Sequence, residues 1–411
     1  MIIPSDLLKN KKILLGVSGS IAVYKSLELT RLFIKAGAEV RVVMTESAKK
    51  FVTPLSFETL TSNKVLDDTN ESWVNEHNHI KTTEWADLFV IAPATANTIA
   101  KLSHAIADNI LLQCALAYPK NKLLSPSANT NMLENPITQA NLQTLATSNY
   151  TFVDTQIKEL ACKTIGDGAM AEPIDIFWAS AKNLLQNDFW TNRESIVTGG
   201  GTIEKIDDVR YISNYSSGKM ASSLASALYC MGANVKLIST KFEDNIPKDI
   251  TKIKVESSSD MQKNIVDSIE NITQSTPEYF SKPYLFMAAA VSDYTPEFVQ
   301  EGKLKKEKLG EKFTLELTQN IDILSSLNKK EIITIGFKAE MDAINAHNNA
   351  SKMLTNKKID AVCLNILKDA SSFGSDTNKI EFISKNESLS LPDANKLTVS
   401  FAILQQAQRI S

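Results

Sequence analysis

The 411-residue sequence contains little cysteine, and its cysteines do not cluster with histidines. The four cysteines, Cys114, Cys162, Cys230 and Cys363, are far apart, and no CxxC pair occurs. This spacing argues against a structural zinc site and against a disulfide framework. We therefore expect a reduced, cytoplasmic protein.

The sequence also lacks an excess of basic charge and a long apolar run. Its 44 lysines and arginines are balanced by 47 acidic residues, giving a formal net charge of −3. A nucleic-acid-binding surface usually needs a basic excess. No segment approaches the roughly 20 apolar residues that cross a membrane, and the first residues lack the order of a signal peptide. We expect neither nucleic acid nor membrane as a partner.

Two parts of the chain begin with the same pattern of strand, glycine-containing turn, helix and strand. In the first part, strands are predicted at 12–17 and 39–44 around a helix at 21–36, and a third strand at 85–93. In the second part, strands are predicted at 195–198 and 234–239 around a helix at 216–231. Alternating strands and helices predict an α/β fold with two doubly wound domains, joined near residues 187–193. Ligands of such sheets bind at the carboxyl ends of the strands.

Two turns at such strand ends favour a phosphate. The segment 16–20 reads Gly-Val-Ser-Gly-Ser and leads into a helix, and the segment 93–98 follows another predicted strand. Backbone N–H groups at a helix start attract anions. The first turn does not have the GxGxxG spacing of the NAD fingerprint, so a tight structural turn and a phosphate site remain equal alternatives for it alone. Two such turns on one sheet favour a nucleotide or a flavin.

His77 and His79 are placed just before the strand predicted at 85–93. On one strand face they could bind a metal, but no third ligand is evident nearby. A single histidine beside a flavin could instead act as a general acid–base, because its ordinary pKa is near 6.5.

The first half resembles the flavin-dependent cysteine decarboxylase family. The resemblance rests on segments 16–25, 79–87, 92–97, 126–132 and 161–170, which occur in the family's order. It implies a flavodoxin-like, doubly wound domain over residues 1–188, with FMN bound between subunits of trimer-based oligomers. It also implies that His79 is the catalytic histidine, that Asn129 holds the substrate carboxylate, and that Cys162 donates a proton. The FMN-site residues implied are Gly19, Ser20, Thr45, Ala94, Thr95, Ala96 and Asn97.

This half departs from the family pattern in the loop that would cover the substrate. Lys163 and Thr164 follow the cysteine where glycine and an acidic residue are usual, and Ala169 replaces an arginine. Ser127 and Ala128 precede the motif asparagine in place of Ala-Met. These departures affect the expected contacts of the loop more than its chemistry.

The second half resembles the CTP-using phosphopantothenate–cysteine ligases of bacteria. The resemblance rests on segments 199–204, 209–214, 216–220, 288–294, 303–306, 319–322 and 336–337. It implies a Rossmann-like α/β domain over residues 189–411 that forms dimers. The Ser-Gly-Lys of the third segment is not a P-loop, because Met220 stands where Ser or Thr is required.

The ligase resemblance also implies residue roles. Arg210 and Asn214 would contact the acyl-cytidylate, and Lys303 would stabilise charge in the transition state. The CTP-site residues implied are Ala288, Ala289, Asp293, Lys303, Asn320, Ile321, Asp322, Phe337, Lys352 and Lys357. Mg2+ would be held mainly by the CTP phosphates, and no protein ligand for it can be named.

Together the two halves predict a bifunctional enzyme of coenzyme A biosynthesis. It would join 4′-phosphopantothenate to L-cysteine with CTP and decarboxylate the product with FMN. Two alternatives remain open: a flavin decarboxylase acting on another cysteine substrate, and a module that binds nucleotides without catalysis. The segments from Asn214 to Phe337 argue against the first alternative, and His79, Cys162 and Lys303 argue against the second.

Overall fold

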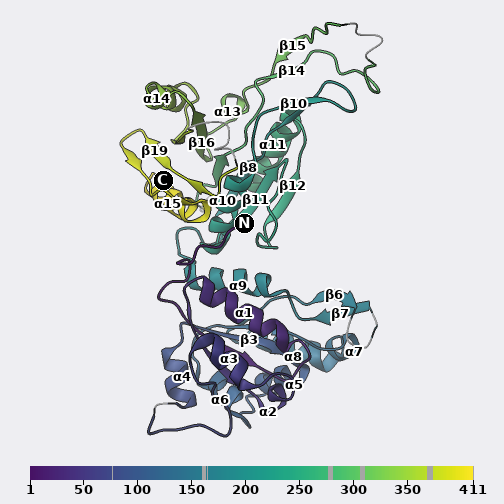
Figure 1. Cartoon of the computed structure of the whole chain (residues 1–411), viewed down its shortest axis with the longest axis vertical. Coiled ribbons are helices and arrows are strands. Elements are labelled where there is room, and N and C mark those ends of the chain that lie inside the picture. Colours follow the sequence, from purple (N-terminus) through teal and green to yellow (C-terminus); the bar gives the residue numbers. More distant parts are fainter. Residues whose placement is uncertain are drawn as a thin grey trace. The chain divides into compact units, whose positions relative to one another are not determined.

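A computed structural model of the chain describes residues 1–75, 77–159, 163, 165–275, 281–305, 311–367 and 374–410. The chain divides into two compact units (Figure 1). One comprises residues 3–185, and the other comprises residues 186–411 together with residues 1–2. Across the described part of the chain, no helix has both the length and the apolar character needed to cross a membrane.

The first unit is built on a five-stranded sheet of order β2-β1-β3-β4-β5, in which every pairing is parallel. This is the strand order of flavodoxin-like folds, so the predicted doubly wound α/β fold is confirmed here. The strands are β1 (Lys12–Val17), β2 (Glu39–Met44), β3 (Leu88–Ala94), β4 (Lys122–Pro126) and β5 (Tyr150–Phe152). A separate hairpin is formed by β6 (Gln156–Glu159) and β7 (Ile165–Ala169).

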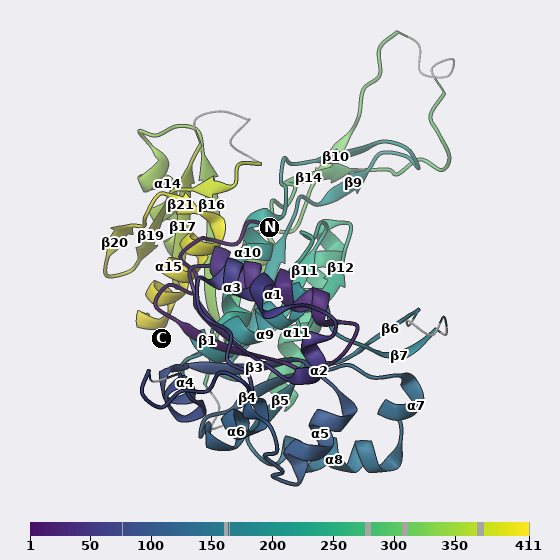
Figure 2. The same cartoon turned by 60° about the horizontal axis from the view of Figure 1, so that its bottom comes forward.

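Helices cover both faces of this sheet (Figure 2). They are α1 (Val23–Lys35), α2 (Glu46–Lys49), α3 (Pro54–Thr61), α4 (His79–Trp85), α5 (Ala96–Ser103), α6 (Ile110–Ala117), α7 (Thr130–Leu133), α8 (Pro136–Ala146) and α9 (Pro173–Leu185). α1 packs with α3 and α9, whereas α6 packs with α4 and α5. Leu14, Phe89, Ile91 and Leu124 from the strands form a buried core with Leu111 of α6.

The strand predicted at 85–93 begins later than expected. The structure places Trp85 at the end of α4 and starts β3 at Leu88. Asn78 caps α4, since its side chain accepts a hydrogen bond from the Lys81 N–H at 2.9 Å. Such an Asn cap favours a helix over the extended chain expected here. The metal alternative required His77 and His79 to share one face of a strand, and the structure contradicts this arrangement because His79 begins α4.

The second unit is built on an eight-stranded sheet of order β12-β11-β8-β13-β16-β17-β19-β20. The pairings from β12 to β17 are parallel, whereas β19 and β20 are antiparallel additions. The strands are β8 (Glu194–Gly199), β11 (Asn234–Ser239), β12 (Thr251–Lys254), β13 (Tyr284–Met287), β16 (Ile333–Glu340), β17 (Ala361–Ile366), β19 (Ile380–Ser384) and β20 (Ser388–Ser390). The second α/β domain is confirmed by this sheet.

Helices and short strand pairs complete the second unit. The helices are α10 (Lys219–Cys230), α11 (Ser258–Ser275), α13 (Ile323–Ser326), α14 (Ala346–Asn356) and α15 (Lys396–Arg409). The short pairs are β9 (Ile203–Lys205) with β10 (Tyr211–Ser213), β14 (Tyr294–Pro296) with β15 (Leu317–Gln319), and β18 (Thr377–Asn378) with β21 (Ala394–Asn395). Ile196 and Leu285 from the sheet pack with Met261 and Ile265 of α11 in a buried core.

Both sheets change direction next to their first strand. After β1 the chain adds β2 on one side and β3 on the other, and after β8 it adds β11 on one side and β13 on the other. A crevice forms at the carboxyl ends of the strands where the order reverses, and ligands of doubly wound sheets bind there. We therefore expect ligand sites at the loops after β1 and β3 and at the loops after β8 and β13.

Candidate functional sites

The strand-end loops of the first unit are joined to one another by hydrogen bonds. Ser18 Oγ donates to the Pro93 carbonyl at 2.7 Å and accepts from the Thr95 N–H at 3.1 Å. Ser20 Oγ lies 3.0 Å from Ser127 Oγ, and the Ser127 N–H donates to the Ala94 carbonyl at 2.9 Å. The loops after β1, β3 and β4 therefore form one continuous rim.

A cavity of about 840 Å³ opens beside this rim. Ser20 and Asn129 both line it, so the structure brings these two predicted residues together. The other predicted FMN-site residues do not line it: Gly19, Thr45, Ala94, Thr95, Ala96 and Asn97. Several of these lie on the adjoining rim, where Thr95 caps α5 and Ala96 and Asn97 form its first turn, whose backbone N–H groups can bind an anion.

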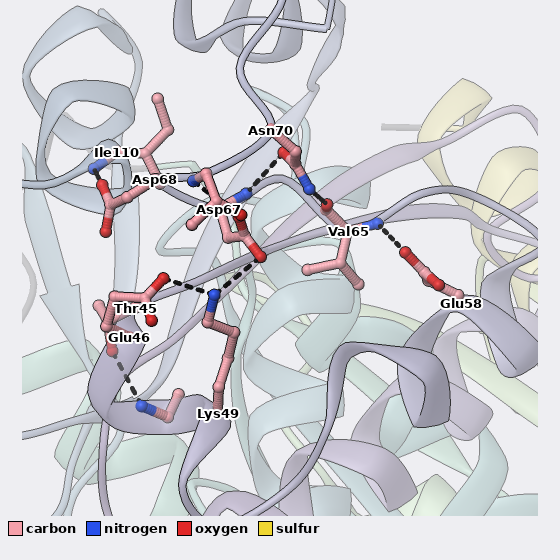
Figure 3. A network of polar contacts seen from close by, with 11 residues as sticks. Thr45, Glu46, Lys49, Glu58, Val65, Asp67, Asp68, Asn70 and Ile110 are labelled. Atoms are coloured by element: carbon pink, nitrogen blue, oxygen red, sulfur yellow. Dashed lines mark hydrogen bonds and ion pairs between the residues drawn. The ribbon is translucent and has the colours of Figure 1, made fainter.

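Thr45 has a structural partner of its own. Its hydroxyl caps α2 by accepting from the Ala48 N–H at 3.2 Å. The short helix is fixed further by Lys49, whose ammonium bonds Asp67 at 3.1 Å (Figure 3). Asp68 in turn accepts from the Ile110 N–H at 2.7 Å, which ties this network to the start of α6.

The β6–β7 hairpin is anchored at the cavity by a buried lysine that the sequence did not single out. Lys25 of α1 donates to the Met170 carbonyl at 2.9 Å and pairs with Glu172 at 3.2 Å. Glu172 also bonds Lys158 of β6. Gly168 has φ of +135°, and a Cβ there would lie 2.2 Å from the Ala128 carbonyl oxygen, so β7 lies directly against the segment before Asn129. Cys162, the predicted proton donor, and Thr164 lie outside the described residues.

His79 stands at the start of α4 and is held by a carboxylate. Its Nδ1 lies 2.7 Å from Glu71 Oε1, and its ring meets Trp73 edge-on at 5.7 Å between centroids. A carboxylate can only accept, so Nδ1 carries the proton and Nε2 of the neutral ring is the acceptor. Glu71 was not predicted, because it lies in an irregular segment eight residues before the histidine.

Within one chain, His79 is not part of the cavity that contains Asn129. It is absent from the residues that line that cavity, and α4 and α7 lie at opposite sides of the first unit in both views (Figures 1 and 2). Among the described residues, no group of three histidine, cysteine or acidic side chains is arranged to hold a metal. The structure therefore offers no third ligand for the His77–His79 metal alternative within the described residues.

In the second unit, a cavity of about 190 Å³ lies at the carboxyl ends of the strands. Its lining includes Gly218 before α10, Ala288 and Ala289 after β13, and Phe337 of β16. Gly218 has φ of +74°, and a Cβ there would lie 2.8 Å from the Lys241 carbonyl oxygen, so glycine is needed at this helix start. Three predicted nucleotide-site residues, Ala288, Ala289 and Phe337, thus line the same cavity as the N-terminus of α10.

Two predicted asparagines fix the loop after β13. Asn214 Nδ2 donates to the Val291 carbonyl at 2.9 Å, and Asn320 Nδ2 donates to the Ser292 carbonyl at 2.9 Å. The Asn320 N–H also donates to the Asp293 carbonyl at 2.8 Å. The structure therefore brings Asn214, Asp293 and Asn320 together.

A buried aspartate connects Arg210 with the segment of Lys303. Asp207 accepts from the Arg210 guanidinium at 2.5 and 3.0 Å and from the Leu304 N–H at 3.0 Å. Arg210 also donates to the Leu304 carbonyl at 2.9 Å. The bond from Arg210 holds the pKa of Asp207 well below its usual range. Lys303 itself is exposed, and its position follows from these contacts of its neighbour.

The remaining predicted nucleotide-site residues lie around α13 and α14. Asp322 caps α13 and pairs with Lys357 at 3.0 Å, while Lys352 and Ile321 are exposed. None of these four lines the cavity that contains Phe337. The expected approach of Lys352 and Lys357 to a triphosphate thus stays a prediction.

The contacts of two lysines, one beside this cavity and one in its lining, were missed by sequence reasoning. Lys219, the first residue of α10, pairs with Asp376 at 2.7 Å and donates to the Gly374 carbonyl at 2.9 Å. Lys396 lines the cavity and bonds the Ser375 carbonyl. These lysines attach the segment before β18 to the start of α10. Their partners are over 150 and about 20 residues away, respectively, so no local pattern could have revealed them.

Comparison with known proteins gives matches over both units. The flavoprotein family matches residues 1–185, and the family described as the DNA/pantothenate metabolism flavoprotein C-terminal domain matches residues 190–410. The coenzyme A biosynthesis bifunctional protein CoaBC of Bacillus subtilis (strain 168) is 37% identical over 413 residues, covering 98% of each chain. Its counterpart in Vibrio cholerae serotype O1 is 35% identical over 405 residues, covering 97% of this chain and 98% of that protein. A solved structure of a CoaBC C-terminal domain is 29% identical and covers 55% of this chain and 98% of its own, with a TM-score of 0.43.

Proposed function

Because the chain belongs to the family of bifunctional coenzyme A biosynthesis proteins, we propose that residues 1–188 decarboxylate phosphopantothenoylcysteine with FMN and that residues 189–411 form it with CTP. The observation that carries this proposal is the full-length match, with both family domains in the same order. A flavin decarboxylase acting on another cysteine substrate does not account for the match over residues 190–410. We place the reaction in the cytoplasm, where the buried thiols of Cys114, Cys230 and Cys363 stay reduced.

In the ligase half, the carboxylate of 4′-phosphopantothenate attacks the α-phosphorus of CTP and releases pyrophosphate. The amine of L-cysteine then attacks the acyl carbon, forming the amide and releasing CMP. Arg210 and Lys303 supply positive charge for the oxygens of these leaving groups, and Asp207 fixes the distance between their segments. Mg2+ on the triphosphate would neutralise part of its charge.

The nucleotide would lie along the crevice between α10 and the loop after β13. The α10 N-terminus offers backbone N–H groups to phosphates, and Phe337 offers an aromatic surface on the cavity wall. Asn214 and Asn320 hold the backbone of residues 291–293 in place, and this loop adjoins Ala288 and Ala289. These contacts support the predicted nucleotide site.

In the decarboxylase half, the residues around the larger cavity fit FMN. Its volume of about 840 Å³ lies within the range of roughly 300 to 1,000 Å³ typical of small-molecule sites. Hydroxyls of Ser20 and Ser127 and the N–H groups that begin α5 are suited to a ribityl phosphate. Bound FMN would supply the two-electron oxidation and re-reduction that make the loss of CO2 possible.

The protein groups of this half would orient the substrate and move protons. Asn129 Oδ1 accepts from the Asn131 N–H at 3.0 Å, so a substrate carboxylate would be bound by the donor Nδ2. Glu71 holds the proton on Nδ1 of His79, which leaves Nε2 to accept a proton from the substrate. Cys162 remains the proposed proton donor on the strength of the resemblance alone.

We also propose that this site is completed by a second copy of the chain. His79 and Asn129 lie at opposite sides of one unit, so one copy would place His79 at the Asn129 cavity of its neighbour. In a cyclic trimer of decarboxylase units, each copy would contribute Asn129 to its own cavity and His79 to the cavity of a neighbour. Dimerisation of the ligase units would then join the trimers.

A mixing experiment tests the shared site. His79→Asn and Asn129→Ala proteins should each be nearly inactive in decarboxylation. If sites are shared and subunits exchange at random, an equal mixture should regain about a quarter of the wild-type sites. A mixture that stays inactive after proven subunit exchange would mean that both residues act within one copy.

The overall proposal is tested by measuring both products. Purified protein containing FMN is given 4′-phosphopantothenate, L-cysteine and Mg2+ with either CTP or ATP. Pyrophosphate and CO2 should both appear with CTP and hardly at all with ATP. Pyrophosphate without CO2 would contradict the decarboxylase half alone, whereas equal rates with ATP would contradict the CTP assignment.

A further inference from the structure

A second cavity of the first unit is not used by the proposed reactions. It has a volume of about 360 Å³ and lies between the edge strand β2, the segment after α3 and helix α4. Its polar lining includes Arg41, Asn63, Lys64, Asn75, His77 and Lys81. Neither Asn129 nor any predicted FMN-site residue lines it.

The lining carries more positive than negative charge. It includes Arg41, Lys64 and Lys81, of which Lys81 is paired with Glu84, and no described residue of the lining is acidic. The nearby acids have partners: Glu84 bonds Lys81 at 3.0 Å, and Asp67 bonds Lys49. Glu76 lies outside the described residues.

Arg41 is held in a position suited to binding an anion. Its guanidinium lies 4.3 Å from the centroid of the Trp85 ring. Stacking of this kind orients the planar group, while its N–H donors lie along its edge. Within the described residues, Arg41 donates no hydrogen bond to the protein, although it is half-buried.

His77 gives an independent indication of a ligand. Its Nε2 is buried and has no hydrogen-bond partner among the described residues. Burial lowers the pKa of His77, and the nearby charge of Lys64 lowers it further, so the ring is neutral at pH 7. A buried polar atom without a partner costs stability, and a ligand in the cavity would remove that cost.

We propose that this cavity binds a small molecule through a phosphate group. Two cations, Arg41 with its forked donor and Lys64, together with a neutral imidazole match a dianion better than a single carboxylate. The volume is large enough for a phosphate monoester with a short organic part. No lining residue has a role in either proposed reaction, although His77 lies two residues before His79, so the proposal does not depend on those reactions.

The test uses inorganic phosphate as the probe and the FMN-containing full chain. The protein has four histidines, of which only His77 lines this cavity, so histidine-selective NMR reports on it directly. His77→Gln identifies the signal by its loss. Phosphate should shift this signal saturably, whereas chloride at the same ionic strength should not.

Substitutions then assign the binding to the lining. Arg41→Met should weaken phosphate binding about tenfold through loss of a charge-assisted bond. Lys64→Gln should weaken it about threefold and should fold normally, because Lys64 is exposed and forms no hydrogen bond or ion pair with the described residues. Lys9→Gln, at an exposed position elsewhere in the same unit, is the matched control.

Two results would overturn the proposal. One is a His77 signal that responds equally to phosphate and chloride. The other is a Lys64→Gln protein that binds phosphate as tightly as the Lys9→Gln control. Because the Lys64 comparison stands alone, the proposal remains testable even if Arg41→Met fails to fold.

Discussion

The two units place their proposed reactive residues in different ways. In the second unit, hydrogen bonds within one chain connect Arg210 with the segment of Lys303, and Asn214 with the loop after β13. In the first unit, His79 and Asn129 are fixed separately and belong to different regions of the surface. Both sheets have the same kind of crevice, so the sheet does not cause the difference. The difference arises because the reactive groups lie on different loops in the two units. It is consistent with our proposal that the decarboxylase site is completed by a second copy of the chain.

The largest effect that would distinguish the two units is expected from the substitution of His79. His79→Asn should lower decarboxylation by about 10² to 10⁴, the usual contribution of a general acid–base group. Release of pyrophosphate and the FMN absorbance should stay unchanged. His104→Asn, at an exposed histidine of the same unit, is the control. Near-normal CO2 release from His79→Asn would remove this residue from the mechanism.

A smaller loss is expected from Glu71, which acts on the substrate only through His79. Glu71→Gln introduces an amide that can donate to Nδ1 and thereby moves the ring proton to Nε2. The kcat for CO2 release should fall about 100-fold, because the base is then held in the wrong tautomer. Glu71→Ala, which cannot donate, should be less impaired. Equal loss in both variants would show that Glu71 is only structural.

In the ligase half, Asp207→Asn should loosen the link between Arg210 and Leu304. We expect pyrophosphate release to fall about tenfold, since displacement of a positioning group by a fraction of an ångström weakens transition-state contacts. CO2 release from added phosphopantothenoylcysteine should be unaffected. Asp244→Asn, at an exposed acid of the same unit, is the control. Parallel losses in both activities would show that the two halves are not independent.

The smallest effect concerns the stability of the first unit and its dependence on pH. Burial by itself raises the pKa of Asp67, but bonds from Thr69 and Lys49 outweigh it and hold the pKa below its usual range. The stabilisation is therefore present above the unfolded pKa of about 3.9 and is lost as the pH falls through the lower folded pKa.

Asp67→Asn should accordingly cost about 1 to 2 kcal/mol at pH 7, because a buried charge-assisted network is broken. The difference from wild type should shrink as the pH falls from 5 to 3. Urea unfolding followed by FMN release measures it, with the exposed Asp6→Asn as control. A difference that stays constant down to pH 3 would contradict the pairing.

The sequence predicted the parts of these sites that depend on local pattern. The resemblance to the flavin-dependent cysteine decarboxylases implied Ser20 and Asn129 as site residues, and the structure places both at one cavity. Trp85 was assigned to a strand because the helix cap at Asn78 was not recognised. Glu71 and Asp207 could not be assigned roles, since irregular segments have no periodicity that reveals their partners. Lys219 and Asp376 are separated by 157 residues, and only the folded chain shows their contact.

The contacts of Asp207 have a consequence for how this family can vary. The Asp207 carboxylate accepts hydrogen bonds both from the turn of the β9–β10 hairpin and from the Leu304 N–H. The neighbouring Asp208 accepts from the Gly302 N–H at 2.8 Å. A substitution in either segment therefore changes the environment of the other. In related sequences, residues 207–210 and 300–304 should consequently evolve together, and grafting only one of these segments between relatives should give a poorer ligase than grafting both.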